Sequence, residues 1–178
     1  MIKERNKIVG RVVVVLTNMK TGVKRVHESK NIVTDAGDLY YAQRGASVAV
    51  PTNFTNGSGV FDAIMELYNG ASAAPAKGND RSDLAGLVTD SDQVIDGTYP
   101  QVGDADGDNT GAGADIITYR VTYAKADANA TGISDVVITN PSPGASEPLL
   151  MHAEFSSPFD KTSDDTLKVF VNHQMNGT

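Results

Sequence analysis

The residues best suited to chemistry lie in one acidic, glycine-rich stretch in the second half of the 178-residue chain. Four carboxylates occupy positions 1, 3, 5 and 12 of this stretch, namely Asp104, Asp106, Asp108 and Asp115. Ca²⁺ takes six to eight hard oxygen ligands from a chain that wraps around it, so the spacing predicts a calcium loop. Position 6 is Asn109 rather than the glycine of an EF-hand loop, and Asp115 replaces the usual glutamate. These departures favour the alternative, a solvated acidic loop.

Elsewhere the nucleophiles and metal ligands show no catalytic spacing. The chain has no cysteine, and its three histidines, His27, His152 and His173, do not form a His-x-x-x-His or His-Glu-x-x-His pattern. There is no phosphate-binding loop, dinucleotide fingerprint or Gly-x-Ser-x-Gly motif. Glu154 follows His152 on the same expected strand face, but such pairs are common by chance. We therefore interpret all three histidines as structural or surface residues, and we expect neither catalysis nor a cofactor beyond the calcium ion considered above.

Charge is distributed unevenly along the chain. The formal net charge of −7 disfavours nucleic acid and anionic membranes as partners. Basic residues nevertheless crowd the first 30 positions, which predicts binding to an acidic partner surface through Lys3, Arg5, Lys7, Arg11, Lys24 and Arg25. The alternative is a soluble domain with two differently charged faces. No apolar run reaches the ~18–20 residues that span a bilayer, and we expect no signal peptide.

The elements that must position these residues begin with a hairpin. Residues 8–16 are rich in valine and predict a strand, residues 17–22 a turn, and residues 23–30 a second strand. A short helix is expected over 35–44, because Thr34 or Asp35 can cap its first turn and Gly45 can end it.

The rest of the chain predicts more strands separated by turns. Residues 61–68 form an expected strand that ends at the turn pair Asn69-Gly70, and 83–88 an expected helical turn. Four alternating segments follow, at 117–123, 133–139, 149–155 and 167–173. The sequence therefore predicts one mainly β domain over 1–178. We expect an antiparallel β-sandwich or barrel with long loops, of which 46–60 and 89–115 look like insertions.

The segment Asn31-Ile32-Val33-Thr34-Asp35-Ala36-Gly37, which follows a hairpin with a Thr-Gly turn, resembles virion structural proteins of tailed bacteriophages. Those proteins open a short helix with an Asn-Leu-Val-Thr-Asn-Ala-Gly-like segment after their first strands. Similar landmarks follow in the same order, at 61–70, 82–84, 117–123, 132–135, 155 and 161–169. The resemblance covers most of the chain apart from 46–60 and 89–115.

The resemblance implies a non-enzymatic structural protein located in the virion. The leading hypothesis is a capsid decoration (cement) protein that binds the major capsid protein and copies of itself, with residues 1–30 and 46–60 making the contacts. The alternative is a homo-oligomeric tail or fibre subunit. A third hypothesis, drawn from the acidic loop, is a calcium-dependent carbohydrate-binding module.

Overall fold

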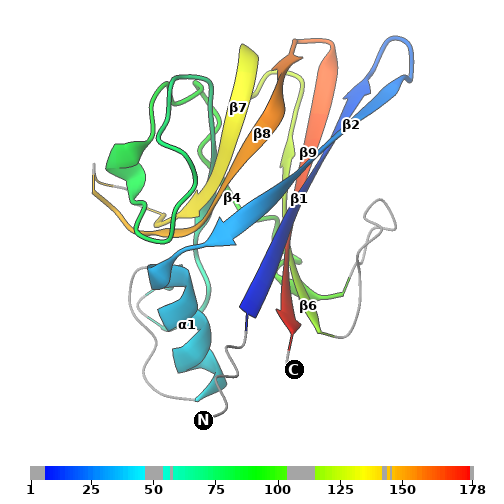
Figure 1. Ribbon diagram of the computed structural model, residues 1–178. Coiled ribbons are helices and arrows are strands. Elements are labelled where there is room, and N and C mark those ends of the chain that lie inside the picture. Colours follow the sequence, from blue (N-terminus) through cyan, green and yellow to red (C-terminus); the bar gives the residue numbers. More distant parts are fainter. Residues whose placement is uncertain are drawn as a thin grey trace.

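The computed structural model describes residues 7–46, 54–56, 58–103, 115–141, 144 and 146–176. Strands account for 53% of the chain, and they form one antiparallel sheet of nine strands that curls into a half-barrel. One α-helix lies at the lower end of the sheet (Figure 1). These observations confirm the predicted mainly β, barrel-like or sandwich-like class with one short helix.

The strands follow one another along the chain as β1 (Lys7–Asn18), β2 (Lys24–Val33), β3 (Ile64–Tyr68), β4 (Gln93–Val94), β5 (Gln101–Val102), β6 (Ile116–Tyr123), β7 (Ala130–Thr139), β8 (Leu149–Lys161) and β9 (Asp165–Asn176). Their order across the sheet is β4-β3-β7-β8-β2-β1-β9-β6-β5. Helix α1 spans Asp35–Gly45, and a 3₁₀ turn, η2, spans Arg81–Asp83. The first strand of the chain therefore lies between β2 and the last strand, β9.

The junction between the β1–β2 hairpin and helix α1 forms as the sequence predicts. Thr34 is the N-cap of α1, because its hydroxyl oxygen accepts a hydrogen bond from the Gly37 N–H at 3.1 Å. The same hydroxyl donates to the Leu149 carbonyl of β8, which ties the helix start to the sheet. A Cβ on Gly37 would lie 2.2 Å from the Leu150 carbonyl oxygen. Glycine is therefore required for the helix to approach β8 this closely.

The main hydrophobic core lies inside the curled sheet. Strands β1, β3, β6, β7, β8 and β9 all contribute buried side chains to it, among them Val14, Met65, Tyr123, Ile138 and Val169. Tyr119 and Tyr123 belong to this core, as the sequence predicts for them. A smaller buried cluster of Val13, Val15 and Phe170 lies on the opposite face of β1 and β9.

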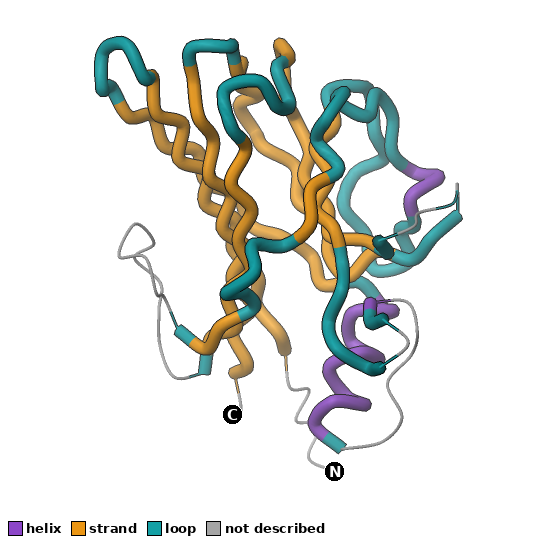
Figure 2. The backbone as a smooth tube through the Cα atoms, turned by 180° about the vertical axis from the view of Figure 1, so that it is seen from behind, coloured by secondary structure: helices purple, strands orange, loops and turns teal. Residues whose placement is uncertain are grey.

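The loop that follows β3 covers the outer face of β3, β7 and β8. It contains η2, which Asp80 caps by accepting from the Ser82 N–H, and it lies on one flank of the sheet (Figure 2). The helical turn predicted over 83–88 is wrong: the turn lies at Arg81–Asp83 and Leu84 is extended. The reason is that the capping box formed by Asp80 and Asp83 starts the turn at Arg81, two residues earlier.

The described part of the 89–115 segment supplies both outermost strands of the sheet. Residues 93–94 pair as β4 with β3, and residues 101–102 pair as β5 with β6. Between them, the Ile95 N–H donates to the Ala63 carbonyl and the Asp96 N–H donates to the Arg120 carbonyl. This segment therefore joins the two sides of the half-barrel, and it hydrogen-bonds along the free edge of β6.

Candidate partner-binding surface

The basic residues predicted to bind a partner are divided along the β1–β2 hairpin. Lys3 and Arg5 lie outside the described residues, and Lys7 is described only as the first residue of β1. Arg11 lies opposite Lys30, whereas Arg25 lies opposite Leu16. Five residues of strand separate Arg11 from Leu16, which is about 17 Å. The structure therefore brings Lys24 and Arg25 together at the tip of the hairpin and leaves Arg11 near the other end.

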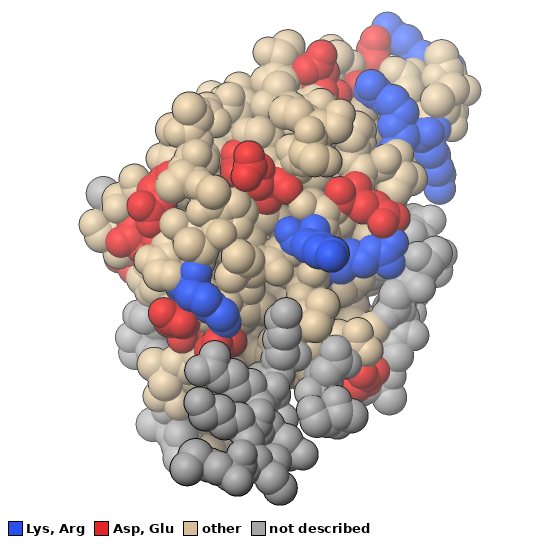
Figure 3. Space-filling view, viewed as in Figure 1, with Lys and Arg blue, Asp and Glu red and all other residues tan. Residues whose placement is uncertain are grey.

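Acidic side chains accompany several of these cations. Arg11 forms an ion pair with Glu28 at 2.7 Å, and Lys20 forms one with Asp164 at 2.8 Å. The guanidinium of Arg25 lies 3.8 Å from the carboxylate of Asp165. In Figure 3, basic side chains gather over the tip of the hairpin at the upper right, with acidic side chains close by. The surface is therefore basic but partly neutralised from within the chain.

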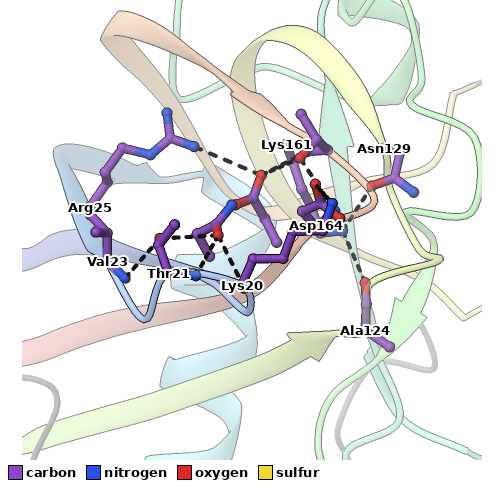
Figure 4. A network of polar contacts seen from close by, with 11 residues as sticks. Lys20, Thr21, Val23, Arg25, Ala124, Asn129, Lys161 and Asp164 are labelled. Atoms are coloured by element: carbon purple, nitrogen blue, oxygen red, sulfur yellow. Dashed lines mark hydrogen bonds and ion pairs between the residues drawn. The ribbon is translucent and has the colours of Figure 1, made fainter.

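A network of polar contacts holds the hairpin tip against two other turns of the same end (Figure 4). The Oδ1 atom of Asn18 accepts from the backbone N–H groups of Lys20 and Thr21, both at 3.1 Å, which shapes the β1–β2 turn. The Nδ2 atom of Asn18 donates to Asp165 at 3.0 Å, at the start of β9. The tip is thus fixed to the β8–β9 turn by side chains rather than by strand pairing alone.

Two buried charges complete this network. Asp165 is 1% exposed; burial alone would raise its pKa, but hydrogen bonds from Thr162 and Asn18, together with Arg25, outweigh burial and lower it. Lys161 is 2% exposed and donates to the Ala124 carbonyl at 2.9 Å. Burial lowers the pKa of Lys161. The ammonium group connects β8 to the turn between β6 and β7.

The same tip exposes apolar side chains. Met19, Val23 and Val26 are 54%, 57% and 56% exposed, although apolar residues of this size are usually buried. They lie within and next to the turn that carries Lys20, and Lys24 is the first residue of β2 after this turn. The hairpin tip, defined here as residues 18–26, therefore presents apolar and basic groups together on a braced support. We take it as the candidate partner-binding surface.

A groove near the start of α1 is a second candidate. It is lined by the ends of β1 and β2 and by charged side chains that include Lys30, Asp35, Asp38 and Lys77. Lys77 and Asp38 form an ion pair at 2.5 Å across it. The groove has cations, carboxylates and apolar walls, but its described residues do not place a nucleophile beside a base.

The predicted calcium ligands are largely outside the described residues. Asp104, Asp106 and Asp108 lie there, so the calcium loop stays a prediction. Asp115 is described, and its carboxylate accepts from the Gln174 side chain at 2.9 Å. Across the described ranges, no three His, Asp or Glu side chains gather in a way that could hold a metal ion. No helix among the residues that the structure describes is long and apolar enough to cross a bilayer.

His173 lies in a buried polar network that the sequence did not predict. Asn31 of β2 donates to His173 Nε2 at 2.8 Å, passing over Gly10 of β1, where an added Cβ would lie 1.1 Å from the Asn31 Oδ1 atom. The other ring nitrogen, Nδ1, contacts the Tyr41 hydroxyl at 2.5 Å, and this hydroxyl lies 2.7 Å from that of Tyr119. Since Nε2 accepts, Nδ1 carries the proton and the ring is neutral. Desolvation by burial lowers the pKa of His173 to about 3.

His152 has a different partner from the one its sequence neighbour suggested. Its Nε2 atom lies 3.0 Å from the Asp135 carboxylate on β7, whereas Glu154 is exposed. Its Nδ1 atom lies 3.1 Å from the Asn79 Oδ1 atom, in the loop that covers the outer face. Nothing in the spacing of His152, Asp135 and Asn79 along the chain could have indicated this contact.

A second buried group joins the same loop to β3. Glu66 is fully buried, and its carboxylate accepts from Arg81 at 3.0 Å and from the Tyr68 hydroxyl at 2.6 Å. Burial raises the pKa of Tyr68, and the carboxylate of Glu66 adds to the effect. The sequence signal was a lone glutamate within an apolar strand, which requires a cation once it is buried.

Comparison with known proteins finds no matching family model, no matching curated protein and no matching solved structure. The resemblance to phage virion proteins therefore stays a prediction. So do the expectations of a non-enzymatic role, of a capsid partner and of a location in the virion.

Proposed function

We propose that this protein is a structural subunit of a tailed-phage particle that binds the outside of the capsid as a decoration protein. The observation that supports the proposal is the hairpin tip. It exposes Met19, Val23 and Val26 next to basic side chains, and the Asn18 and Asp165 contacts hold it in place. A pre-ordered surface loses little conformational entropy on binding, which suits a protein that docks many times on a lattice.

The proposed mechanism is mechanical. Apolar side chains of the tip are buried at a junction between capsid subunits, and its cations face acidic groups of the shell. Burial of apolar area stabilises the junction by about 25 cal/mol per Å² before the costs of association. Many copies on one shell would offset the outward pressure of packaged DNA.

Co-sedimentation with empty phage shells tests the proposal. We expect the protein to pellet with shells at a copy number that matches the lattice, and Val23→Asp to reduce the bound amount. Val94→Asp is the matched control, because Val94 is 63% exposed but belongs to β4, on the other side of the fold from the hairpin. Absence of lattice-matched binding, or equal loss in both variants, would contradict the proposal.

A tail or fibre subunit is the second candidate. The observation that favours it is the unpaired part of strand β2, because repeated pairing of strand edges builds rings and fibres. Imaging of particles that carry a labelled subunit separates the two locations.

A further inference from the structure

Lys161 is a buried lysine whose ammonium group contacts only neutral oxygen atoms among the described residues. The side chain is 2% exposed, and its hydrogen bonds go to the Ala124 carbonyl at 2.9 Å and to the Asn129 Oδ1 atom at 3.1 Å. Figure 4 shows both contacts. The buried carboxylate of Glu66, by contrast, has Arg81 beside it. Lysine is almost never fully buried unless it is paired. The charge of Lys161 is therefore poorly compensated.

The surroundings of Lys161 favour its neutral, nucleophilic form. Burial lowers the pKa of Lys161, and the charges of Asp127 and Asp165 oppose this effect without cancelling it. A lowered pKa increases the fraction of neutral amine, which is the nucleophilic form of lysine. Asp127 acts on the ammonium more strongly than Asp165 does, and its carboxylate also accepts from the Ala124 N–H at 2.9 Å. A carboxylate that can accept a proton therefore lies in the same turn as both partners of Lys161.

Asn129 presents the carbonyl end of its carboxamide to Lys161. Its Nδ2 atom donates to the carbonyls of Lys125 at 2.9 Å and Ala126 at 3.0 Å, so Oδ1 is the atom that faces the ammonium. Because a C=O bond is about 1.23 Å long, the Asn129 Cγ atom lies within about 4.3 Å of Lys161 Nζ. Reacting atoms in a near-attack geometry are about 3–3.5 Å apart, so Nζ has to move by about 1 Å or less.

We propose that Lys161 and Asn129 form an intramolecular amide (isopeptide) bond in the folded chain. The ammonium gives one proton to the Asp127 carboxylate, and the neutral Nζ then attacks the Asn129 Cγ atom. As the bond between Cγ and Nδ2 breaks, Nδ2 takes a proton from Nζ and leaves as ammonia. Ammonia recovers the first proton from Asp127 and departs as ammonium. The reaction needs no oxidant, reductant or second reactant.

The bond has two consequences for the fold. It replaces a buried ammonium by a neutral amide, which removes the cost of burying the charge of Lys161. It also joins the end of β8 covalently to the turn between β6 and β7, across 32 positions of the sequence. Asn129 is exposed, so the ammonia has a path to solvent. The bond does not depend on a location in a phage particle.

Mass spectrometry of the purified, folded chain tests the proposal. The wild type should be lighter than its sequence mass by one ammonia, and a protease digest should contain a branched peptide that joins Lys161 to Asn129. Lys161→Arg keeps a positive charge and hydrogen-bond donors, but a guanidinium is not deprotonated in proteins, so this variant should keep its full mass. Asn129→Ala should also keep its full mass, because it lacks the carboxamide. Circular dichroism checks that each variant is folded.

Two controls make the assignment specific. Lys30→Met removes an exposed lysine near the other end of the β1–β2 hairpin, so it should lose one ammonia as the wild type does. A succinimide at Asn69-Gly70 would release the same mass, so the branched peptide decides between the two sites. On a denaturing gel the wild type should migrate ahead of Asn129→Ala, because a cross-link constrains the unfolded chain.

Three results would overturn the proposal. One is a folded wild-type chain that keeps its full sequence mass, which would leave Lys161 as a buried lysine held by hydrogen bonds alone. Another is a mass loss that maps to Asn69-Gly70 without a branched peptide. The third is a Lys161→Arg chain that loses one ammonia as readily as the wild type.

Discussion

Replacing His173 by glutamine should make this fold less sensitive to acid. The imidazole is fully buried and neutral, with Asn31 donating to one nitrogen and the other nitrogen donating to Tyr41. A glutamine side chain offers one acceptor and one donor group in place of the two ring nitrogens, and it does not titrate. The substitution therefore keeps the hydrogen-bond types of the network while it removes its ionisable group.

The size of the stability loss at low pH follows from the lowered pKa of His173. Burial brings the pKa of His173 from 6.5 to about 3. Below pH 6.5 the His173 imidazole is protonated in the unfolded chain, whereas in the folded chain it stays neutral down to about pH 3. Stability from the neutral ring is therefore fully present above pH 6.5 and is lost as pH falls toward 3. At about 1.4 kcal/mol per pKa unit, the loss is about 2 kcal/mol at pH 5 and approaches 5 kcal/mol at pH 3.

Urea unfolding at several pH values between 7 and 4 measures this effect. The difference in the free energy of unfolding between His173→Gln and the wild type should shift in favour of the variant by about 1.4 kcal/mol for each pH unit below 6.5. His27→Gln is the control: the pKa of His27 is also lowered, by burial and then by Arg25, but this ring is partly exposed, so its effect should be smaller. Parallel pH profiles for wild type and His173→Gln would refute the reasoning.

Three other substitutions test the buried polar contacts by urea unfolding. Gly10→Ala should lower the free energy of unfolding by about 2–4 kcal/mol, because its Cβ displaces the Asn31 side chain. The double variant Gly10→Ala, Asn31→Ala should recover part of this loss, and no recovery would contradict the explanation. Arg81→Met should lower the free energy of unfolding by about 3–5 kcal/mol, because it leaves the Glu66 carboxylate buried without a cation. A double variant that also carries Glu66→Gln should lose less stability. Asp165→Ala should cost about 2–4 kcal/mol and speed amide exchange at the hairpin tip; unchanged exchange would show that the tip is held by other contacts.

The buried polar groups share a structural position: each joins the sheet to a segment distant in sequence. Glu66 and His152 bind the loop that covers the outer face, and His173 binds α1. Asp165 binds the β1–β2 turn. Hydrogen bonds and ion pairs have strict geometry, so these contacts select one position for each loop where apolar packing alone would allow several. This is the physical reason that a chain with long loops can present an ordered hairpin tip.

The elements were largely predictable because their signals are local. The high valine content of residues 8–16 located β1, alternating apolar residues located β6 and β9, and the Thr34 cap located the start of α1. Segments without such a signal were not predictable. The two-residue strands β4 and β5 lie in a stretch with the composition of a loop, and they exist because the free edges of β3 and β6 offer backbone partners.

For the candidate site, the amino-acid pattern alone indicated that basic residues crowd the first two strands and that these strands form a hairpin. The tertiary structure decided that Lys24 and Arg25 lie at one end with Met19 and Val23, and that Asp164 and Asp165, some 140 residues later, lie beside them. It also decided that the backbone ladder between β2 and β8 covers only Asn31–Val33, and that beyond it Ser29 and His27 contact β8 through their side chains. Strand patterns depend on neighbours in sequence, whereas charge compensation and edge pairing depend on residues that only the fold brings together.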